Sequence, residues 1–169
     1  MDALSRLNAA SDQDAREALA RCCGASRWVA AMAARRPFRD EAALYAAADE
    51  VWAGLSPADW REAFAHHPRI GDKEALRARF ASTRQWAAGE QAGADAAPDD
   101  VLEALARGNR EYEARFGHIF VVCATGKSAP EMLSLLRERL ANEPEHETRV
   151  AAGEQAKITR LRLEKLLQP

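Results

Sequence analysis

The residues best suited to acid–base chemistry are two adjacent histidines, His66 and His67, in the sequence HHPRIGD at residues 66–72. Because a proline ring disfavours the α conformation of the residue before it, a helix that begins at Pro57, with Ser56 as its N-cap, should end near His66. His67 would then lie on a turn, where the negative end of the helix dipole favours a protonated imidazole. Such a histidine could donate a proton to an anionic substrate. The alternative is a surface histidine that only marks a helix end.

A second candidate is the pair Glu90 and Gln91, which lies between Gly89 and Gly93 in an Ala- and Gly-rich stretch ending at Pro98. Since a glutamine side chain both donates and accepts hydrogen bonds, this pair could bind a ureido or imide group. The alternative is an exposed loop whose charges are solvated.

The sequence IFVVCA at residues 119–124 is the one stretch that does not have a helical pattern. It is apolar, rich in β-branched residues, and bounded by Gly117 and Gly126. Because the chain has no second strand pattern, we expect a short extended segment among helices, whose backbone N–H and C=O groups need partners. An amide-rich ligand could supply them; the alternative is a buried connector satisfied by side chains or water.

Arg162 is a third candidate, near the end of the chain. It falls between Ile158 and Leu166, each four residues away, which places it on the apolar stripe of the last predicted helix. A guanidinium in that position needs an anionic partner, either a substrate carboxylate or an internal acid, unless the side chain extends to the surface.

These candidates depend on helices for their placement. Alanine, leucine, arginine and glutamate dominate the chain, so we expect an all-α fold, a multi-helix bundle forming a single domain over residues 1–169. Helix starts are predicted at Ser11, at Asp72, at Asp99, at Ser128 (in a capping box with Glu131) and at Glu143-Pro144; helix ends are predicted at Gly24, Arg36-Pro37, Gly54 and Gly117.

Composition narrows the class of protein. A chain of 169 residues with a formal net charge of −2 favours neither nucleic acid nor an anionic membrane as a partner. No apolar run is long enough to span a bilayer, and Met1 is not followed by a secretory signal. The three cysteines, Cys22, Cys23 and Cys123, fit reduced thiols better than a disulfide framework. With no peroxisomal tripeptide at residues 167–169, a cytoplasmic location is expected.

Together these fragments resemble the 2-oxo-4-hydroxy-4-carboxy-5-ureidoimidazoline (OHCU) decarboxylases, which catalyse the third step from urate to (S)-allantoin. The resemblance spans nearly the whole chain, and the order and spacing of the fragments make it specific. The fragments are RCCG at 21–24 with Trp28, RPF at 36–38, AF at 63–64, HPRIG at 67–71, EQAG at 90–93, Asn109 with Tyr112, FG at 116–117, FVVCA at 120–124, RL at 139–140 with Asn142, and KI at 157–158 with RL at 162–163.

The resemblance implies an all-helical enzyme of purine (urate) degradation, usually a homodimer, that acts on a small-molecule substrate and needs neither metal nor organic cofactor. His67 matches the catalytic histidine, Glu90 a second catalytic carboxylate and Gln91 a substrate-binding amide. The remaining matches to substrate-binding positions are Pro68, Ala87, Phe120, Val121, Val122, Cys123, Ala124 and Arg162. Two departures are Ala87, where many members have serine, and Ile119, where many have proline.

In the predicted reaction His67 is the general acid, and backbone N–H groups of the extended segment stabilise negative charge on the substrate ring. Two other functional classes remain open. One is a metal-dependent helical hydrolase, whose ligands would come from His66, His67, Asp72, His118 or His146, although their spacing follows no recognised rule. The other is a non-catalytic interaction module, which would require a large exposed apolar patch.

Overall fold

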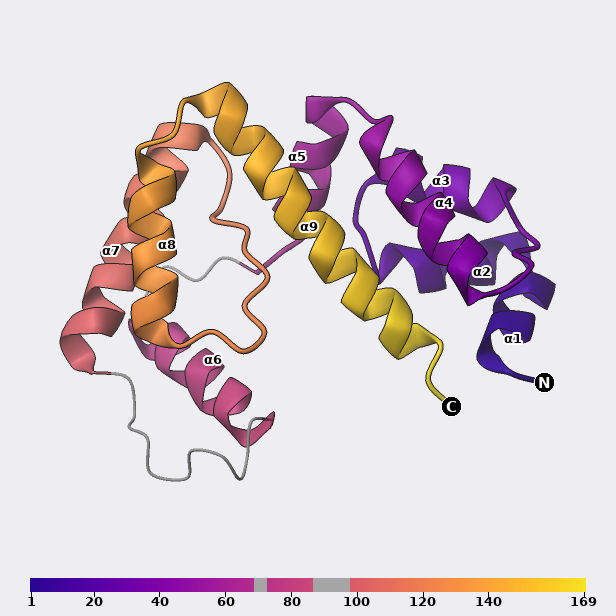
Figure 1. Ribbon diagram of the computed structural model, residues 1–169, viewed down its shortest axis with the longest axis horizontal. Coiled ribbons are helices and arrows are strands. Elements are labelled where there is room, and N and C mark those ends of the chain that lie inside the picture. Colours follow the sequence, from indigo (N-terminus) through magenta and orange to yellow (C-terminus); the bar gives the residue numbers. More distant parts are fainter. Residues whose placement is uncertain (69–72, 87–97) are drawn as a thin grey trace. The chain divides into compact units, whose positions relative to one another are not determined.

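The structure is a computed structural model that describes residues 1–68, 73–86 and 98–169. Within these residues the chain forms helices joined by irregular segments, which confirms the predicted all-α class (Figure 1). The helices are α1 (Ala3–Ala9), α2 (Asp12–Ala20), α3 (Ser26–Ala34), α4 (Glu41–Ala53), α5 (Pro57–Ala65), α6 (Lys73–Trp86), α7 (Asp99–Phe116), α8 (Ala129–Leu140) and α9 (Pro144–Leu166).

The predicted helix caps explain several of these boundaries. Ser11, Ser56 and Ser128 each accept a hydrogen bond from the backbone N–H three residues later. At Ser56 the capping box is complete, because the Asp59 carboxylate also accepts from the Ser56 backbone. Gly117 ends α7 in the left-handed conformation, with φ of 78°, where a residue without a Cβ is strongly favoured.

Other boundaries differ from the prediction. Helix α1 was not predicted; its N-cap is Asp2, whose carboxylate accepts from the Ser5 N–H at 2.7 Å. Asp99 is the first residue of α7 rather than its cap, a place taken by Pro98. The predicted start at Asp72 lies outside the described residues.

Contacts between Cα atoms divide the chain into two compact units. Unit 1 comprises Met1–His67 and Ala152–Pro169, and unit 2 comprises Pro68–Ala151. Helix α9 therefore contributes its first two turns to unit 2 and the rest to unit 1. The organisation of residues 1–169 as one domain stays a prediction.

Buried aromatic side chains form much of the core of unit 1. Trp28 is fully buried, and its indole N–H donates to the Ala48 carbonyl at 3.2 Å. The indole N–H of Trp52 donates to the Ala152 carbonyl at 2.9 Å, which joins α4 to the last part of the chain. Each tryptophan thus buries a large apolar ring and still satisfies its polar atom.

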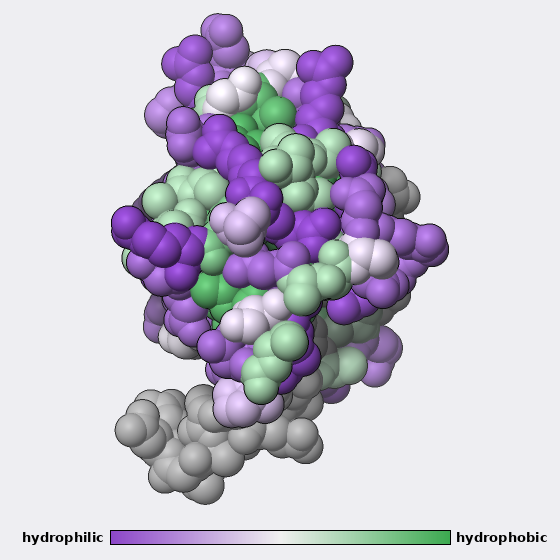
Figure 2. Space-filling model, turned by 90° about the vertical axis from the view of Figure 1, so that its right-hand side faces the viewer, coloured by the Kyte–Doolittle hydropathy of each residue, from purple (hydrophilic) through white to green (hydrophobic). Residues whose placement is uncertain are grey.

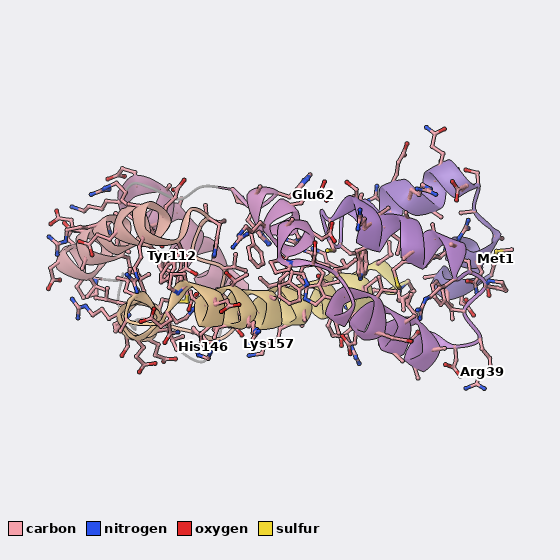
Figure 3. The ribbon with its side chains drawn as sticks, turned by 90° about the horizontal axis from the view of Figure 1, so that it is seen from above. Met1, Arg39, Glu62, Tyr112, His146 and Lys157 are labelled. Atoms are coloured by element: carbon pink, nitrogen blue, oxygen red, sulfur yellow. The ribbon has the colours of Figure 1, made fainter. Side chains whose placement is uncertain are left out.

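The face of the molecule drawn in Figure 2 is mainly hydrophilic. Figure 2 shows a face of the molecule where apolar side chains occur in small areas between polar and charged ones. Among the described residues the large apolar side chains with substantial exposure are Met1 and Leu161, and Figure 3 shows Met1 and Arg39 projecting outward. On the face drawn in Figure 2 the apolar areas are small, whereas an interaction module would need a large apolar patch. Within the same residues, no helix combines the length and the apolar composition of a membrane span.

Helices α7 and α8 pack closely in the core of unit 2. A Cβ placed on Gly108 would lie 2.5 Å from Cδ2 of Leu136, so the glycine permits this close approach. Buried side chains of both helices, of α6 and of the segment before α8 form the core cluster of this unit: Leu76, Leu102, Leu105, Tyr112, Val122, Met132, Leu133 and Leu136.

Candidate active site

His67 lies directly after the C-cap of α5, as predicted. His66 is the cap residue, and the His67 N–H donates to the Phe64 carbonyl at 3.2 Å. The imidazole is half-buried, and its Nε2 lies 2.5 Å from Oε1 of Gln155. The catalytic candidate is therefore held by a side chain of α9 as well as by the end of its own helix.

Gln155 and Thr159 were not identified from the sequence. The Gln155 side chain is almost fully buried, and its Nε2 donates to the Thr159 hydroxyl at 3.0 Å. Both residues lie on one face of α9 together with Leu163, which is also buried. Their four-residue spacing was visible in the sequence, but polar residues at that spacing do not indicate burial by themselves.

Arg162 does not lie on the buried stripe of α9, so that prediction was wrong. The buried stripe passes through Gln155, Thr159 and Leu163, whereas Arg162 is exposed. Its guanidinium Nη1 donates a long hydrogen bond, 3.5 Å, to the carbonyl of Cys22. Whether Arg162 binds substrate does not depend on its burial, and that role stays a prediction.

The turn after α2 brings two buried thiols to the same part of unit 1. Burial raises the pKa of both Cys22 and Cys23 to about 11, against the opposing effect of the Arg162 charge. For Cys23, hydrogen bonds with the Ala25 backbone and the Thr159 side chain also oppose the rise in pKa. Both side chains are therefore neutral thiols near pH 7, in keeping with the predicted reduced state.

Two contacts fix the end of α5 against this turn and against α3. A Cβ on Gly24 would lie 2.4 Å from Cγ of His66, so only glycine permits the turn to approach the histidine. Ser26, at the start of α3, donates to the Glu62 carboxylate from its backbone at 2.8 Å and from its hydroxyl at 2.6 Å. These hydrogen bonds hold the pKa of Glu62 (labelled in Figure 3) below its usual value. The position of His67 is thus supported from three elements.

The two raised thiol pKa values predict a loss of stability at alkaline pH. A thiol that stays neutral in the folded protein and ionises in the unfolded chain stabilises the fold below its ordinary pKa of 9.0, and this contribution is lost as the pH rises towards about 11. We expect urea unfolding at pH 8, 9 and 10 to show a steeper decline in the free energy of unfolding for the wild type than for the Cys22→Ala/Cys23→Ala variant. Parallel declines would contradict the assignment.

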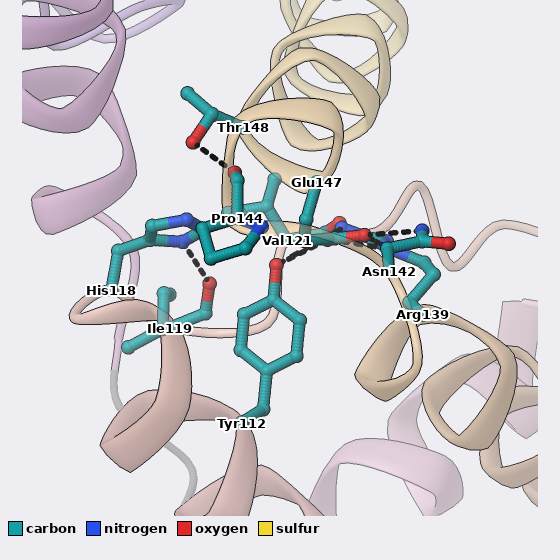
Figure 4. Close-up of polar contacts among 9 residues, drawn as sticks. All are labelled: Tyr112, His118, Ile119, Val121, Arg139, Asn142, Pro144, Glu147 and Thr148. Atoms are coloured by element: carbon teal, nitrogen blue, oxygen red, sulfur yellow. Dashed lines mark hydrogen bonds and ion pairs between the residues drawn. The ribbon is translucent and has the colours of Figure 1, made fainter.

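The segment 119–124 of unit 2 has no regular secondary structure, as predicted. Several of its carbonyl groups accept hydrogen bonds from side chains: Val121 from Nη1 of Arg139 at 2.6 Å and Cys123 from Nζ of Lys127 at 2.8 Å. These contacts agree with the predicted alternative, a buried connector satisfied by side chains. Figure 4 shows Arg139 and Val121 together with the surrounding polar residues.

Arg139 belongs to a buried polar cluster that was not predicted from the sequence. Its guanidinium pairs with the fully buried Glu147 carboxylate, with Nε 2.9 Å and Nη2 2.5 Å from Oε2 (Figure 4). Glu147 also accepts from the Tyr112 hydroxyl and, at 3.0 Å, from the Asn142 amide. Burial and the Glu147 hydrogen bond raise the pKa of Tyr112, so its hydroxyl remains a donor.

This cluster fixes the extended segment in two ways. Besides the hydrogen bond to Val121, the Arg139 guanidinium lies over the Phe120 ring, 4.6 Å from its centroid. A sequence signal for the cluster existed, because Arg139 continues the buried stripe of Met132 and Leu136 on α8. An arginine on such a stripe requires an internal acceptor.

The predicted site residues fall into three groups. His67 and Arg162 belong to unit 1, and Pro68 and residues 120–124 belong to unit 2. Ala87, Glu90 and Gln91 lie outside the described residues. The convergence of all of them on one pocket stays a prediction. Within the part of the chain that the structure describes, no three His, Cys, Asp or Glu side chains are grouped to hold a metal ion.

Comparison with known proteins extends over nearly the whole chain. The family model for OHCU decarboxylase matches residues 8–164. The chain is 36% identical over 145 residues to the uric acid degradation bifunctional protein TTL of Arabidopsis thaliana, a match that covers 86% of this chain and 45% of that protein. It is 33% identical over 141 residues to the 2-oxo-4-hydroxy-4-carboxy-5-ureidoimidazoline decarboxylase of Amia calva, covering 82% and 79% of the two chains.

A solved structure gives a consistent result. The crystal structure of an OHCU decarboxylase in the presence of (S)-allantoin superposes with a TM-score of 0.72 at 34% sequence identity, covering 94% of this chain and 99% of that one. The chain spans less than half of the Arabidopsis protein, so the family match concerns one part of that longer relative. From the extent of these matches, the chain belongs to the OHCU decarboxylase family.

Proposed function

We propose that this protein decarboxylates 2-oxo-4-hydroxy-4-carboxy-5-ureidoimidazoline to (S)-allantoin and CO2 during urate degradation, with His67 as the general acid. The observation that carries the proposal is the match of the family over residues 8–164, which includes the histidine placed at the end of α5. The half-buried position of His67 and its hydrogen bond to Gln155 support the assigned role, because a proton donor must be held in place beside its substrate.

The chemistry requires one bond to break and one proton to be delivered. The bond between the ring and the carboxylate breaks, CO2 leaves, and the electron pair is delocalised into the ring C=N bond. The hydroxyl-bearing carbon becomes the ring carbonyl when its hydroxyl proton is lost to solvent, and the ring nitrogen that received the electron pair takes up a proton. A proton from the His67 imidazolium is added to the ureido-bearing carbon on one face, which gives a single enantiomer of allantoin. Glu90 orients the hydroxyl or ureido group, and Arg162 binds the carboxylate.

Product chirality tests this proposal directly. The substrate, freshly generated from urate, decays spontaneously, so the assay compares enzyme with no enzyme. We expect faster formation of allantoin and a higher enantiomeric excess of the (S) form, measured by circular dichroism. Allantoin formed at the spontaneous rate without enantiomeric excess would overturn the proposal.

Variants of the predicted binding residues should separate binding from turnover. Gln91→Ala is expected to raise KM, because the Gln91 amide would bind the ureido or ring amides of the substrate. The expected loss of binding free energy is about 1–3 kcal/mol, the cost of leaving a buried polar group without its hydrogen-bond partner. Glu90→Ala should chiefly lower kcat. Steady-state kinetics measure both, and Arg16→Ala, which removes an exposed side chain that pairs with Asp12 on α2, serves as a control. A Gln91→Ala enzyme with unchanged KM would remove Gln91 from the binding site.

A metal chelator is expected to leave activity unchanged. The proposed reaction places every step on protein side chains and backbone groups. Exhaustive treatment with a chelator, followed by kinetics with and without added zinc or manganese, measures this. Activity that disappears with the chelator and returns with either metal would favour the metal-dependent alternative.

The proposal includes a homodimer in the cytoplasm. The dimer is supported by the family resemblance and is tested by light scattering coupled to gel filtration. The location is supported by the three cysteines of the chain, an odd number with two of them adjacent, which fit reduced thiols better than a disulfide framework.

A further inference from the structure

The amide of Gln155 connects His67 to the interior of unit 1. Gln155 is 1% exposed, which is unusual for a glutamine and requires that both ends of its amide be hydrogen-bonded. Its Oε1 faces Nε2 of His67 at 2.5 Å, and its Nε2 donates to the Thr159 hydroxyl at 3.0 Å.

The direction of these hydrogen bonds follows from Thr159. This residue is 6% exposed, and its hydroxyl also forms a side-chain hydrogen bond with Cys23. When the hydroxyl hydrogen is directed to the sulfur, the oxygen accepts from the Gln155 amide N–H. The amide oxygen then faces the imidazole, and an oxygen can only accept. Nε2 of His67 must therefore carry a hydrogen.

We propose that Gln155, anchored by Thr159, is a positioning residue that keeps a proton on Nε2 of His67 and so makes Nδ1 the nitrogen that delivers a proton to the substrate. The inference rests on the proposed function of His67 as general acid. After Nδ1 has lost its proton, the neutral ring is the tautomer with hydrogen on Nε2, and the Gln155 oxygen stabilises that tautomer. An acceptor on one ring nitrogen commonly sets the role of the other.

Three variants and one spectroscopic readout test the inference. Gln155→Met removes the acceptor at similar volume, Gln155→Glu retains it, and Thr159→Val removes the anchor with little change of shape. Glu164→Gln is the matched control, because Glu164 lies on the same helix and pairs with Arg160 at the surface. Nitrogen-15 NMR of the labelled ring reports the tautomer, and His67→Asn assigns its signals among the four histidines of the chain.

For the wild type we expect the neutral His67 ring to carry its hydrogen on Nε2. In Gln155→Met we expect a mixture of tautomers and a fall in kcat of about 10- to 100-fold, the range seen when the outer partner of a metal-bound histidine is removed. KM should change little. Thr159→Val should show a smaller effect in the same direction, and Glu164→Gln none.

Gln155→Glu should rescue turnover and shift the alkaline limb of the kcat profile to higher pH, because a carboxylate favours the imidazolium. Among the described residues, the titratable or charged side chains of this region include Glu62 and His66 on α5, Cys22 and Cys23 on the turn, and Arg162 on α9. They are the same in every variant, so a shift between variants reports the change at position 155.

A double-variant cycle separates positioning from a general structural effect. If Gln155 acts through His67, Gln155→Met should not lower the residual turnover of His67→Asn any further. An Nε2-protonated ring in Gln155→Met with unchanged kcat would overturn the inference while leaving the proposed function intact. An inactive wild type would overturn the proposed function, whereas the NMR tautomer would still report on Gln155.

Discussion

Replacing His67 with asparagine is expected to give a folded protein that has lost most of its decarboxylase activity. Proton transfer from a placed side chain contributes about 100- to 10,000-fold to a rate, so we expect kcat to fall within that range. The fold should survive because the His67 ring is only half-buried and lies after the last residue of α5. The measurement is the initial rate of (S)-allantoin formation, together with thermal unfolding to verify the fold.

His66→Asn provides the matched control for this experiment. His66 has the same chemistry and lies one residue earlier, where it packs against Gly24. Its replacement should lower activity much less than His67→Asn. Near-normal turnover in a folded His67→Asn protein would remove His67 from the mechanism, and equal losses in both variants would mean that the motif does not distinguish the two histidines.

The second large effect is expected at the buried ion pair of unit 2. Arg139→Met should lower the free energy of unfolding by about 3–5 kcal/mol, because it leaves the Glu147 carboxylate buried without its cation. Such a loss is comparable to the entire stability of a marginal domain. Urea unfolding of the wild type and the variant measures it. Activity should fall as well, since Arg139 also holds the Val121 carbonyl.

Two comparisons isolate the cause of that loss. The Arg139→Met/Glu147→Leu variant, which removes both charges, should recover part of the stability, because the penalty comes from the unpaired carboxylate. Removing the exposed ion pair between Arg16 and Asp12 with Arg16→Gln should cost no more than about 1 kcal/mol. An Arg139→Met protein as stable as the wild type would show that the cluster contributes nothing to the fold.

Much of the helical architecture could be predicted because its signals are local. The hydroxyl caps at Ser11, Ser56 and Ser128, and the left-handed Gly117, depend on residues within one turn of each helix end. His67 could be placed for the same reason, since the proline after it limits how far α5 continues. Helix α1 was not predicted because its seven residues are too few to show a helical period of apolar side chains.

The polar interior could not be predicted because its partners are distant in the sequence. Gln155 can be buried because it forms a hydrogen bond with His67, and Glu147 can be buried because it pairs with Arg139 and accepts a hydrogen bond from Tyr112. The prediction that Arg162 lies on the buried face of α9 was wrong for the same reason. It placed the aliphatic residues of α9 on that face, whereas the polar residues Gln155 and Thr159 are buried there. The roles of Glu90 and Gln91 rest on the family resemblance and stay predictions.

Unit 1 is discontinuous in sequence, because its last part, Ala152–Pro169, follows the whole of unit 2. A ribosome releases residues 1–67 first, while the acceptor for the Trp52 indole and the amide that holds His67 are still untranslated. Unit 2, by contrast, is one continuous stretch that can fold as it emerges. The hydrogen bond between His67 and Gln155 therefore cannot form until the whole of unit 2 has been translated, and a chain cut short before Gln155 would retain the histidine without the amide that holds its ring.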